Sequence, residues 1–352
     1  MFSEDTLTAL NLCLKKRIPF ALYILPGQQT PRFLACRKFG TCPIDDTSNG
    51  FLINAFNNEY GLPVIIRDEL SERDIIDCAM SMPESPLPEI HPYEISTVRE
   101  EYIELTNKVI DRLKIDGGKS VISRVICGDA SRLNIAGIIQ DYFDAFRSTF
   151  RYVYYTPRTG AWMGASPEIL VERNSGDRHI STMSLAGTRK RADVSWDDKN
   201  MEEHDYVTNY IVAVLKSLGL NPKVGMPENI GFGSIEHLCH RIQAECNWPL
   251  VKVANALSPT PALAGFPLEK AFEHIRFAEK HPRRCYGGYV GCSDESGTHI
   301  YVNLRCMHFS ENKFCIYAGG GITRKSDAES EWNETAAKSS VLFNLIKKYE
   351  TE

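Results

Sequence analysis

The feature that most constrains the fold is a series of strand-like runs in the C-terminal half, separated by only short turns. The runs are HLCHRIQAEC (237–246), CYGGYVGC (285–292), HIYVNLRCM (299–307) and FCIYAGG (314–320), and the turns include DESG (294–297) and SENK (310–313). Strands that follow each other through tight turns pair in an antiparallel manner. Helical patterns occur between other strands without a regular β-α-β repeat, so the sequence predicts an α+β fold with a large, mostly antiparallel core.

The first part of the chain contains further short strand-like runs. They are PFALYIL (19–25), FLINAF (51–56) and LPVII (62–66), and they precede the proline-rich stretch MPESPLPEIHP (82–92). Proline at this density is typical of a boundary loop. From residue 93 to 115, apolar residues recur three and four positions apart, which predicts an amphipathic helix. We therefore divide the chain into a β-rich N-terminal part, residues 1–90, and a catalytic domain, residues 91–352.

Composition excludes several classes of function. The net charge of −5 results from 40 basic and 45 acidic residues that are mixed along the chain, so no basic stripe is available for nucleic acid. No signal peptide and no run of eighteen apolar residues is present, which predicts a cytoplasmic protein without a membrane span. The 11 cysteines include no C-x-x-C pair, and several lie in strand-like runs, so we expect buried, reduced thiols.

The strongest local signal for chemistry lies near the C-terminus, in YAGGGITRKSDAESEWNET (317–335). We interpret the three glycines 319, 320 and 321 as a loop whose N–H groups could approach a carboxylate. On the helix that follows, Glu331, Glu334 and Lys338 are spaced to share one face. Two carboxylates so close together favour a hard divalent cation such as Mg²⁺. A solvated helix face with a Glu334–Lys338 ion pair explains the same spacing, and on spacing alone it is the commoner case.

Other ionisable residues give weaker signals. Glu168 precedes the apolar run ILV, and burial there would keep its carboxyl protonated, as a general acid requires. Lys119 begins the strand KSVISR and Arg124 ends it at an odd offset, so their side chains should face opposite ways. For Glu168, Lys119, Glu203 and His237 alike, an ordinary structural or exposed role is commoner for such a local pattern than a catalytic one.

Nine segments taken together and in order resemble the chorismate-utilising enzymes. That family includes isochorismate synthase, salicylate synthase, anthranilate synthase component I and aminodeoxychorismate synthase component I. The resemblance covers roughly residues 93 to 349. It implies a single domain of two large antiparallel sheets wrapped by helices, with the active site in the cleft between them. The segments are KSVISR, GASPEILVER, SLAGTRKR, EEHDYV, IEHLCHRI, LSPTPALAGFP, RRCYGGYVG, YVNLRC and YAGGGITRKSDAESEWNET.

The resemblance also implies an essential Mg²⁺ and a set of site residues. Glu203 and Glu334 correspond to the metal ligands, and Glu331 is expected to contact the ion through water. Ala186, Gly187 and Thr188 are expected near the substrate ring, with His237 close by. The enolpyruvyl carboxylate of chorismate is expected to bind to a group that comprises Tyr286, Arg305, Lys338 and the three glycines Gly319, Gly320 and Gly321.

Two positions indicate which reaction to expect within the family. Lys119 stands where the members that add water to chorismate carry a lysine base, and Ala186 replaces the lysine nucleophile of aminodeoxychorismate synthases. Glu168 would then act as the acid that protonates the leaving C4 hydroxyl. We expect chorismate to be converted to isochorismate by a monomer without a glutamine amidotransferase subunit. Salicylate synthase, which goes on to eliminate pyruvate, remains the alternative. A non-catalytic relative would have lost some of Lys119, Glu168, Glu203 and Glu334, and all four are present.

Overall fold

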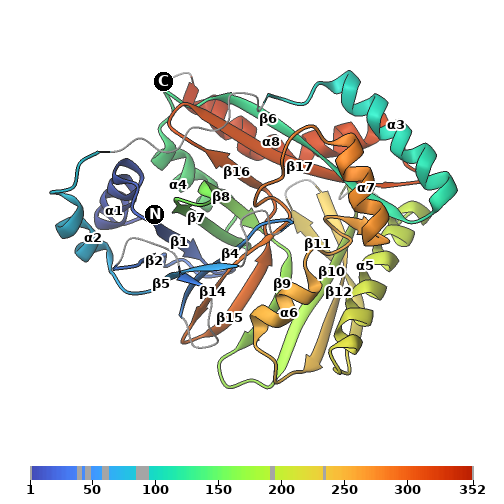
Figure 1. Ribbon diagram of the computed structural model, residues 1–352, viewed down its shortest axis with the longest axis horizontal. Helices are drawn as coiled ribbons and strands as arrows, with labels where there is room; N and C mark the ends of the chain where they lie inside the picture. Colours follow the sequence, from blue (N-terminus) through green and yellow to red (C-terminus); the bar gives the residue numbers. More distant parts are fainter. Residues whose placement is uncertain are drawn as a thin grey trace.

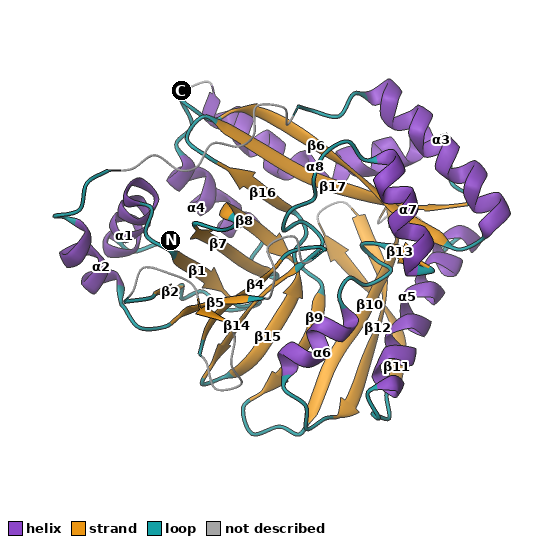
Figure 2. Cartoon of the chain, viewed as in Figure 1, coloured by secondary structure: helices purple, strands orange, loops and turns teal. Residues whose placement is uncertain are grey.

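Two antiparallel sheets form the centre of the molecule (Figures 1 and 2). The computed structural model describes residues 2–37, 42–43, 49–57, 63–84, 95–190, 195–232 and 235–350. Within them, the first sheet has eight strands in the order β13 (Gly265–Phe266), β6 (Lys119–Asp129), β17 (Lys313–Thr323), β16 (Cys306–Phe309), β8 (Gly160–Ser166), β7 (Phe150–Thr156), β1 (Phe20–Ile24) and β2 (Arg32–Ala35).

The second sheet has nine strands over the same described ranges. Their order is β11 (Lys223–Phe232), β12 (Ile235–Glu245), β10 (His179–Lys190), β9 (Ile169–Asn174), β15 (Gly297–Val302), β14 (Tyr289–Asp294), β4 (Gly50–Asn54), β5 (Val64–Arg67) and β3 (Cys42–Pro43). β14 and β15 are joined by the predicted turn at 294–297, and β16 and β17 by the one at 310–313. The predicted α+β, two-sheet, antiparallel architecture is confirmed. Residues 1–90 contribute strands to both sheets.

Large aromatic side chains fill the space between the sheets. On β7, Phe150, Tyr152 and Tyr154 alternate with residues that face the other way, and all three contact Phe51 of β4 in the opposite sheet. Centroid separations of 5.5–6.3 Å are typical of favourable aromatic pairs. The opposite face of β7 is also covered, since Val153 packs against helices. This coverage on both faces explains why RYVYYT lacks the polar alternation of a half-exposed strand.

Helices cover the outer faces of both sheets (Figure 1). α1 (Glu4–Lys16), α4 (Ile135–Ala145) and α8 (Ala328–Glu350) pack on the first sheet, and α2 (Glu72–Ala79) packs on α1. α3 (Arg99–Asp116) and α7 (Leu268–Ala278) contact β6, while α5 (Asp198–Ser217) lies along β10 and α6 (Leu250–Leu257) contacts β9. The helix predicted over 93–115 begins at residue 99. The proline-rich boundary is only partly within the described residues, which omit 85–94.

One predicted strand is in fact two. HIYVNLRCM was taken as a single run, but β15 ends at Val302 in the second sheet and β16 begins at Cys306 in the first. The residues between them carry the chain from one sheet to the other, and Arg305 there has a positive φ of 51°. Similarly, only the second half of CYGGYVGC is a strand, because β14 begins at Tyr289. Both corrections concern the segments that approach the candidate site.

Two further expectations concern thiols and membranes. No disulfide joins the cysteines in the described part of the chain, and most of them are buried, as the strand positions indicated. Over the same residues, none of the helices combines the length and apolar character that crossing a bilayer requires.

Candidate active site

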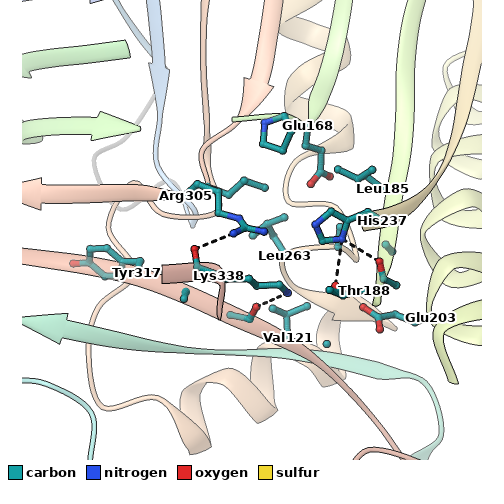
Figure 3. Close-up of a pocket in the computed structure, with 18 of the residues that line it drawn as sticks. Val121, Glu168, Leu185, Thr188, Glu203, His237, Leu263, Arg305, Tyr317 and Lys338 are labelled. Carbon is teal, nitrogen blue, oxygen red and sulfur yellow. Dashed lines mark hydrogen bonds between the residues drawn. The ribbon is translucent and has the colours of Figure 1, made fainter. Parts of the chain in front are cut away.

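A cavity of about 80 Å³ lies between the two sheets (Figure 3). Its wall contains β6 and β17 of the first sheet, β10 and β12 of the second, and side chains from α5 and α8. Eleven of the predicted site residues line it: Glu168, Ala186, Gly187, Thr188, Glu203, His237, Tyr286, Arg305, Gly319, Gly321 and Lys338. Lys119, Gly320, Glu331 and Glu334 are not among the lining residues.

Lys119 lies directly behind this wall, where it forms an ion pair. It is the first residue of β6, and its Nζ lies 2.9 Å from Oε1 of Glu203 on α5. Only 1% of the Lys119 side chain is exposed. A Cβ atom on Gly321 would lie 2.7 Å from Cδ of Glu203 and 3.0 Å from Cε of Lys119, so the glycine leaves the room that the pair occupies. As predicted, Arg124 faces the other way and donates to Thr335 Oγ1.

The three glycines form part of a strand, so their interpretation as a loop was wrong. Gly319, Gly320 and Gly321 belong to β17 and pair with Ser123, Ile122 and Val121 of β6. Because side chains alternate along a strand, Gly319 and Gly321 face the cavity, while a Cβ on Gly320 would point to Glu331 at 2.8 Å. The Gly319 carbonyl accepts a hydrogen bond of 3.0 Å from Lys338 Nζ. The glycines thus let α8 and α5 side chains approach the strand.

Carboxylates and lysines from α5 and α8 meet beside β17. Lys199 Nζ lies 2.9 Å from Glu331 Oε1 and 3.7 Å from Glu203 Oε2. Glu334 pairs with Lys338 at 2.6 Å, so the predicted i,i+4 contact exists, but in a largely buried place. Burial raises the pKa of Glu331 to about 7, with the Glu334 carboxylate adding to the rise and Lys199 opposing it.

The same environment shifts the pKa values of two partners. Burial alone would raise the pKa of Glu203, but Lys119 and Lys199 outweigh it and lower this pKa to about 2. Burial alone would lower the pKa of Lys199, but the carboxylates of Glu203 and Glu331 raise it above its usual value. The ionised forms therefore stabilise each other.

The pKa of Glu168 is shifted in the opposite direction from that of Glu203. Glu168 immediately precedes β9 in the second sheet, and 3% of the residue is exposed. Burial raises the pKa of its carboxyl from 4.5 to about 8, although Lys119 and Lys338 act in the other direction. The sequence-based expectation that this carboxyl is buried is confirmed. Glu168 faces the cavity, so it can donate a proton to a molecule bound there (Figure 3).

Arg305 extends into the cavity from the crossing between the sheets. Its left-handed backbone is held by neighbours, since Tyr142 Oη donates to the Arg305 carbonyl at 2.7 Å and Arg305 Nη1 donates to the Lys338 carbonyl at 2.9 Å. Burial lowers the pKa of Arg305 to about 10, which still leaves it charged at neutral pH. Beside Arg305, the ring of Tyr286 stacks on the ring of Tyr317, with 5.6 Å between the ring centroids. A guanidinium in an apolar wall is suited to bind a carboxylate through two hydrogen bonds.

An irregularity in β10 shapes the other side of the cavity. The register with β12 shifts between Ala186 and Thr188, and Gly187 in between has a φ of 76°, which glycine adopts without strain. His237 Nδ1 lies 3.0 Å from the Gly187 carbonyl and 3.2 Å from Thr188 Oγ1. Burial lowers the pKa of His237 to about 3, so the ring is neutral. The bond to the carbonyl requires a proton on Nδ1, which leaves Nε2 as an acceptor.

Sequence reasoning missed some residues of this region. Tyr317, Leu185, Leu263 and Val121 line the cavity, and Lys199 bridges the carboxylates. Lys199 could have been found, because it precedes Glu203 by one helical turn in the helical segment DKNMEEH. The apolar residues carry no signal that distinguishes them from core residues.

The donor set fits a hard divalent cation. Glu203, Glu331 and Glu334 offer carboxylate oxygens, and Glu331 Oε2 is buried without a hydrogen-bond partner among the described residues. Nowhere in the described ranges do three His, Cys, Asp or Glu side chains converge closely enough to enclose a metal ion. Mg²⁺ does not require this, since it commonly uses one or two protein carboxylates and keeps waters.

A buried carboxyl, a lysine–carboxylate pair and an arginine lie in or beside one cavity, an arrangement typical of sites that bind small anionic molecules. A sequence model of the family described as "Chorismate binding enzyme" matches residues 66–347. The chain belongs to this family.

Relatives and solved structures agree with this membership. Isochorismate synthase EntC of Escherichia coli is 31% identical over 245 residues, which is 65% of this chain and 62% of EntC. The chain thus spans less than two thirds of that relative. Isochorismate synthase MenF of E. coli is 29% identical over 80% of this chain and 68% of MenF. The crystal structure of the putative isochorismate synthase DhbC of Bacillus anthracis has a TM-score of 0.76 at 21% identity, covering 97% of this chain and 99% of DhbC. The latter likeness concerns the fold.

Proposed function

We propose that this protein is an isochorismate synthase, which converts chorismate to isochorismate by adding water at C2 of the ring with loss of the C4 hydroxyl. The observation that carries the proposal is that one site contains both a carboxyl with a raised pKa and a buried lysine. Glu168 faces the cavity with a raised pKa, and Lys119 lies behind the wall at the Glu203 side. Relatives named isochorismate synthase support the assignment.

Glu168 and Lys119 divide the proton transfers between them. Glu168, from the second sheet, protonates the departing C4 hydroxyl, and its raised pKa keeps the required proton near neutral pH. Lys119, from the first sheet, takes a proton from the water that attacks C2. The proposed acid and base belong to different sheets. This placement suits a reaction in which the C4 hydroxyl leaves the ring and a water molecule attacks C2.

The contact with Glu203 limits when Lys119 can act. Lys119 Nζ lies 2.9 Å from Glu203 Oε1, and only an unprotonated amine can accept a proton. The proposed base must therefore be unprotonated when the water is activated. Only 1% of the Lys119 side chain and 10% of the Glu203 side chain are exposed, which leaves little water to compete for the pair.

Binding of the substrate is assigned to the cationic side of the cavity. Arg305, Lys338 and Tyr286 bind the enolpyruvyl carboxylate, and the neutral His237 accepts a hydrogen bond through Nε2. Glu203 and Glu334 are the proposed ligands of Mg²⁺, with Glu331 acting through water. When bound, Mg²⁺ supplies positive charge that orients the ring carboxylate.

Product analysis tests the proposal directly. Purified protein is incubated with chorismate and Mg²⁺, and the products are separated by chromatography. Isochorismate alone is the expected result. Salicylate with pyruvate would replace the proposal by salicylate synthase, and anthranilate formed on addition of ammonia would contradict both. Turnover that persists in EDTA would remove Mg²⁺ from the scheme.

Two matched variants test the residue roles. Lys119→Ala and Glu168→Gln should each lose turnover by about 10²–10⁴-fold, the usual contribution of a general acid or base. Glu172→Gln, in the strand β9 that begins directly after Glu168 but with a quarter of its side chain exposed, should retain it. We further propose that the protein acts as a monomer without an amidotransferase subunit. Light scattering of the purified chain tests this by measuring its molecular mass in solution.

A further inference from the structure

Lys199 lies at an unusual position for a lysine. It precedes Glu203 by four residues on α5, so that its side chain extends along the same helix face. Its Nζ reaches across to α8, 2.9 Å from Glu331 Oε1, and remains 3.7 Å from Glu203 Oε2. The ammonium thus lies between carboxylates of two helices, and 18% of the side chain is exposed.

Charge explains why an ammonium is stable there. Glu203, Glu331 and Glu334 are all buried or nearly so, and like charges at such close quarters disfavour folding unless a cation compensates them. Lys338 is engaged by Glu334 and Lys119 by Glu203 Oε1. Among the described contacts, Lys199 is therefore the cation that compensates the charge of Glu331 and lies closest to Oε2 of Glu203.

We propose that Lys199 is a tethered cation that occupies the carboxylate cluster in the metal-free protein and is displaced when a divalent cation binds. The inference rests on the metal part of the proposed function. The ammonium lies beside Glu203, a proposed metal ligand, and pairs with Glu331, so a cation bound among these carboxylates would meet a like charge there, and the lysine competes with the metal. Its four-carbon stem is flexible and already partly exposed, which gives the displaced ammonium a path to water.

This arrangement stabilises the metal-free enzyme at a cost in metal affinity. Without Lys199 the cluster would hold uncompensated negative charge, which weakens the fold and strengthens the attraction for a cation. The two effects are linked. The free energy that Lys199 contributes to the stability of the metal-free protein is the free energy that a metal ion must overcome to displace it. A lysine that merely holds two helices together would give only the first effect.

Calorimetric titration with Mg²⁺ in the absence of chorismate measures this competition. Lys199→Met should bind Mg²⁺ about tenfold more tightly than the wild type. Lys199→Arg, which keeps the charge, should bind no more tightly than the wild type. The matched control is Lys325→Met, because Lys325 pairs with Glu202, the neighbour of Glu203, at the surface at 3.1 Å. This control should bind Mg²⁺ like the wild type.

Thermal unfolding provides a second readout. Lys199→Met should unfold at a lower temperature than the wild type without metal, and the difference should close at saturating Mg²⁺. A purely structural ion pair would leave the same difference with and without Mg²⁺, and that result would overturn the inference. Mg²⁺ binding to Lys199→Met that is equal to or weaker than that of the wild type would overturn it as well.

The outcome is separable from that of the product assay. Competition between Lys199 and Mg²⁺ can be observed in a protein that makes salicylate or no product, and isochorismate can form in a protein whose Lys199→Met variant binds Mg²⁺ no more tightly. If neither the wild type nor Lys199→Met binds Mg²⁺, the inference fails together with the assigned metal ligands, while the acid and base assignments stand.

Discussion

Replacing Glu168 by glutamine should stabilise the protein while it removes activity. In the folded state the pKa of this carboxyl is about 8, whereas the ordinary value is 4.5. The folded protein therefore retains a proton that the unfolded chain releases, and the stability of the wild type falls as the pH rises from 4.5 towards 8. Glutamine has nearly the same shape and no proton to lose, so the variant lacks this loss.

The size of the gain follows from the two pKa values. At pH 7 the carboxyl of the unfolded chain is ~2.5 pH units above its pKa of 4.5, while the folded carboxyl is still mostly protonated. Each unit corresponds to roughly 1.4 kcal/mol, which gives about 3 kcal/mol in favour of Glu168→Gln at pH 7. Near pH 4.5 the difference should approach zero, because both states then bind the proton.

Urea-induced unfolding, followed by tryptophan fluorescence at several pH values between about 5 and 8, measures this difference as a free energy of unfolding. Glu172→Gln serves as the control, since Glu172 lies four residues after Glu168, in β9, and pairs with His299 at 3.2 Å in a partly exposed place. Its effect should stay within about 1 kcal/mol.

A difference between Glu168→Gln and the wild type that does not change with pH would refute the reasoning. It would mean that the carboxyl is ionised in the folded protein, and then it could not be the acid. Retained isochorismate formation in Glu168→Gln would separately remove Glu168 from the mechanism, whatever its pKa.

Three other changes test the architecture of the site. Gly321→Ala should displace Glu203 and reduce turnover by about 100-fold, whereas Gly225→Ala, with 3.2 Å to its nearest neighbour, should leave turnover intact; steady-state kinetics measures both. Arg305→Lys should raise the KM for chorismate by roughly 10–100-fold, since one charged hydrogen bond is lost; an unchanged KM would exclude it as a ligand. Lys119→Met should lower the free energy of unfolding by about 3 kcal/mol by removing the nearer of the two ammonium groups beside the buried Glu203, and adding Glu203→Gln should restore part of it; additive losses in denaturant titrations would contradict the pairing.

The sequence was sufficient for the parts of the fold that depend on local pattern. The turns at 294–297 and 310–313 and the apolar runs beside them predicted adjacent antiparallel strands, and those strands form. The crossing at Arg305 could not be predicted in this way. Arginine rarely adopts a positive φ, and nothing in HIYVNLRCM marks the point where the chain leaves one sheet for the other.

The three glycines show a similar limit. Three consecutive glycines are typical of a loop, because each one weakens a strand. Here Gly319, Gly320 and Gly321 lie in β17, where a side chain would collide with groups from α5, α8 and the loop before β14. The requirement comes from residues that are distant in sequence, so the local pattern could not distinguish it from a turn.

Glu168 and Glu203 show why the spacing of carboxylates alone could not assign their roles. Both are buried, with 3% and 8% of the residue exposed, yet the pKa of one rises to about 8 and that of the other falls to about 2. Burial alone cannot explain pKa shifts in opposite directions, so the charged neighbours of each carboxyl must explain the difference. Lys119 lies 2.9 Å from Glu203 and compensates its charge, which leaves Glu168 without a comparable partner. Lys119, together with Lys199, thus divides two carboxyl groups into an anion and an acid, and the nearer contact, between β6 and α5, is one that only the folded chain creates.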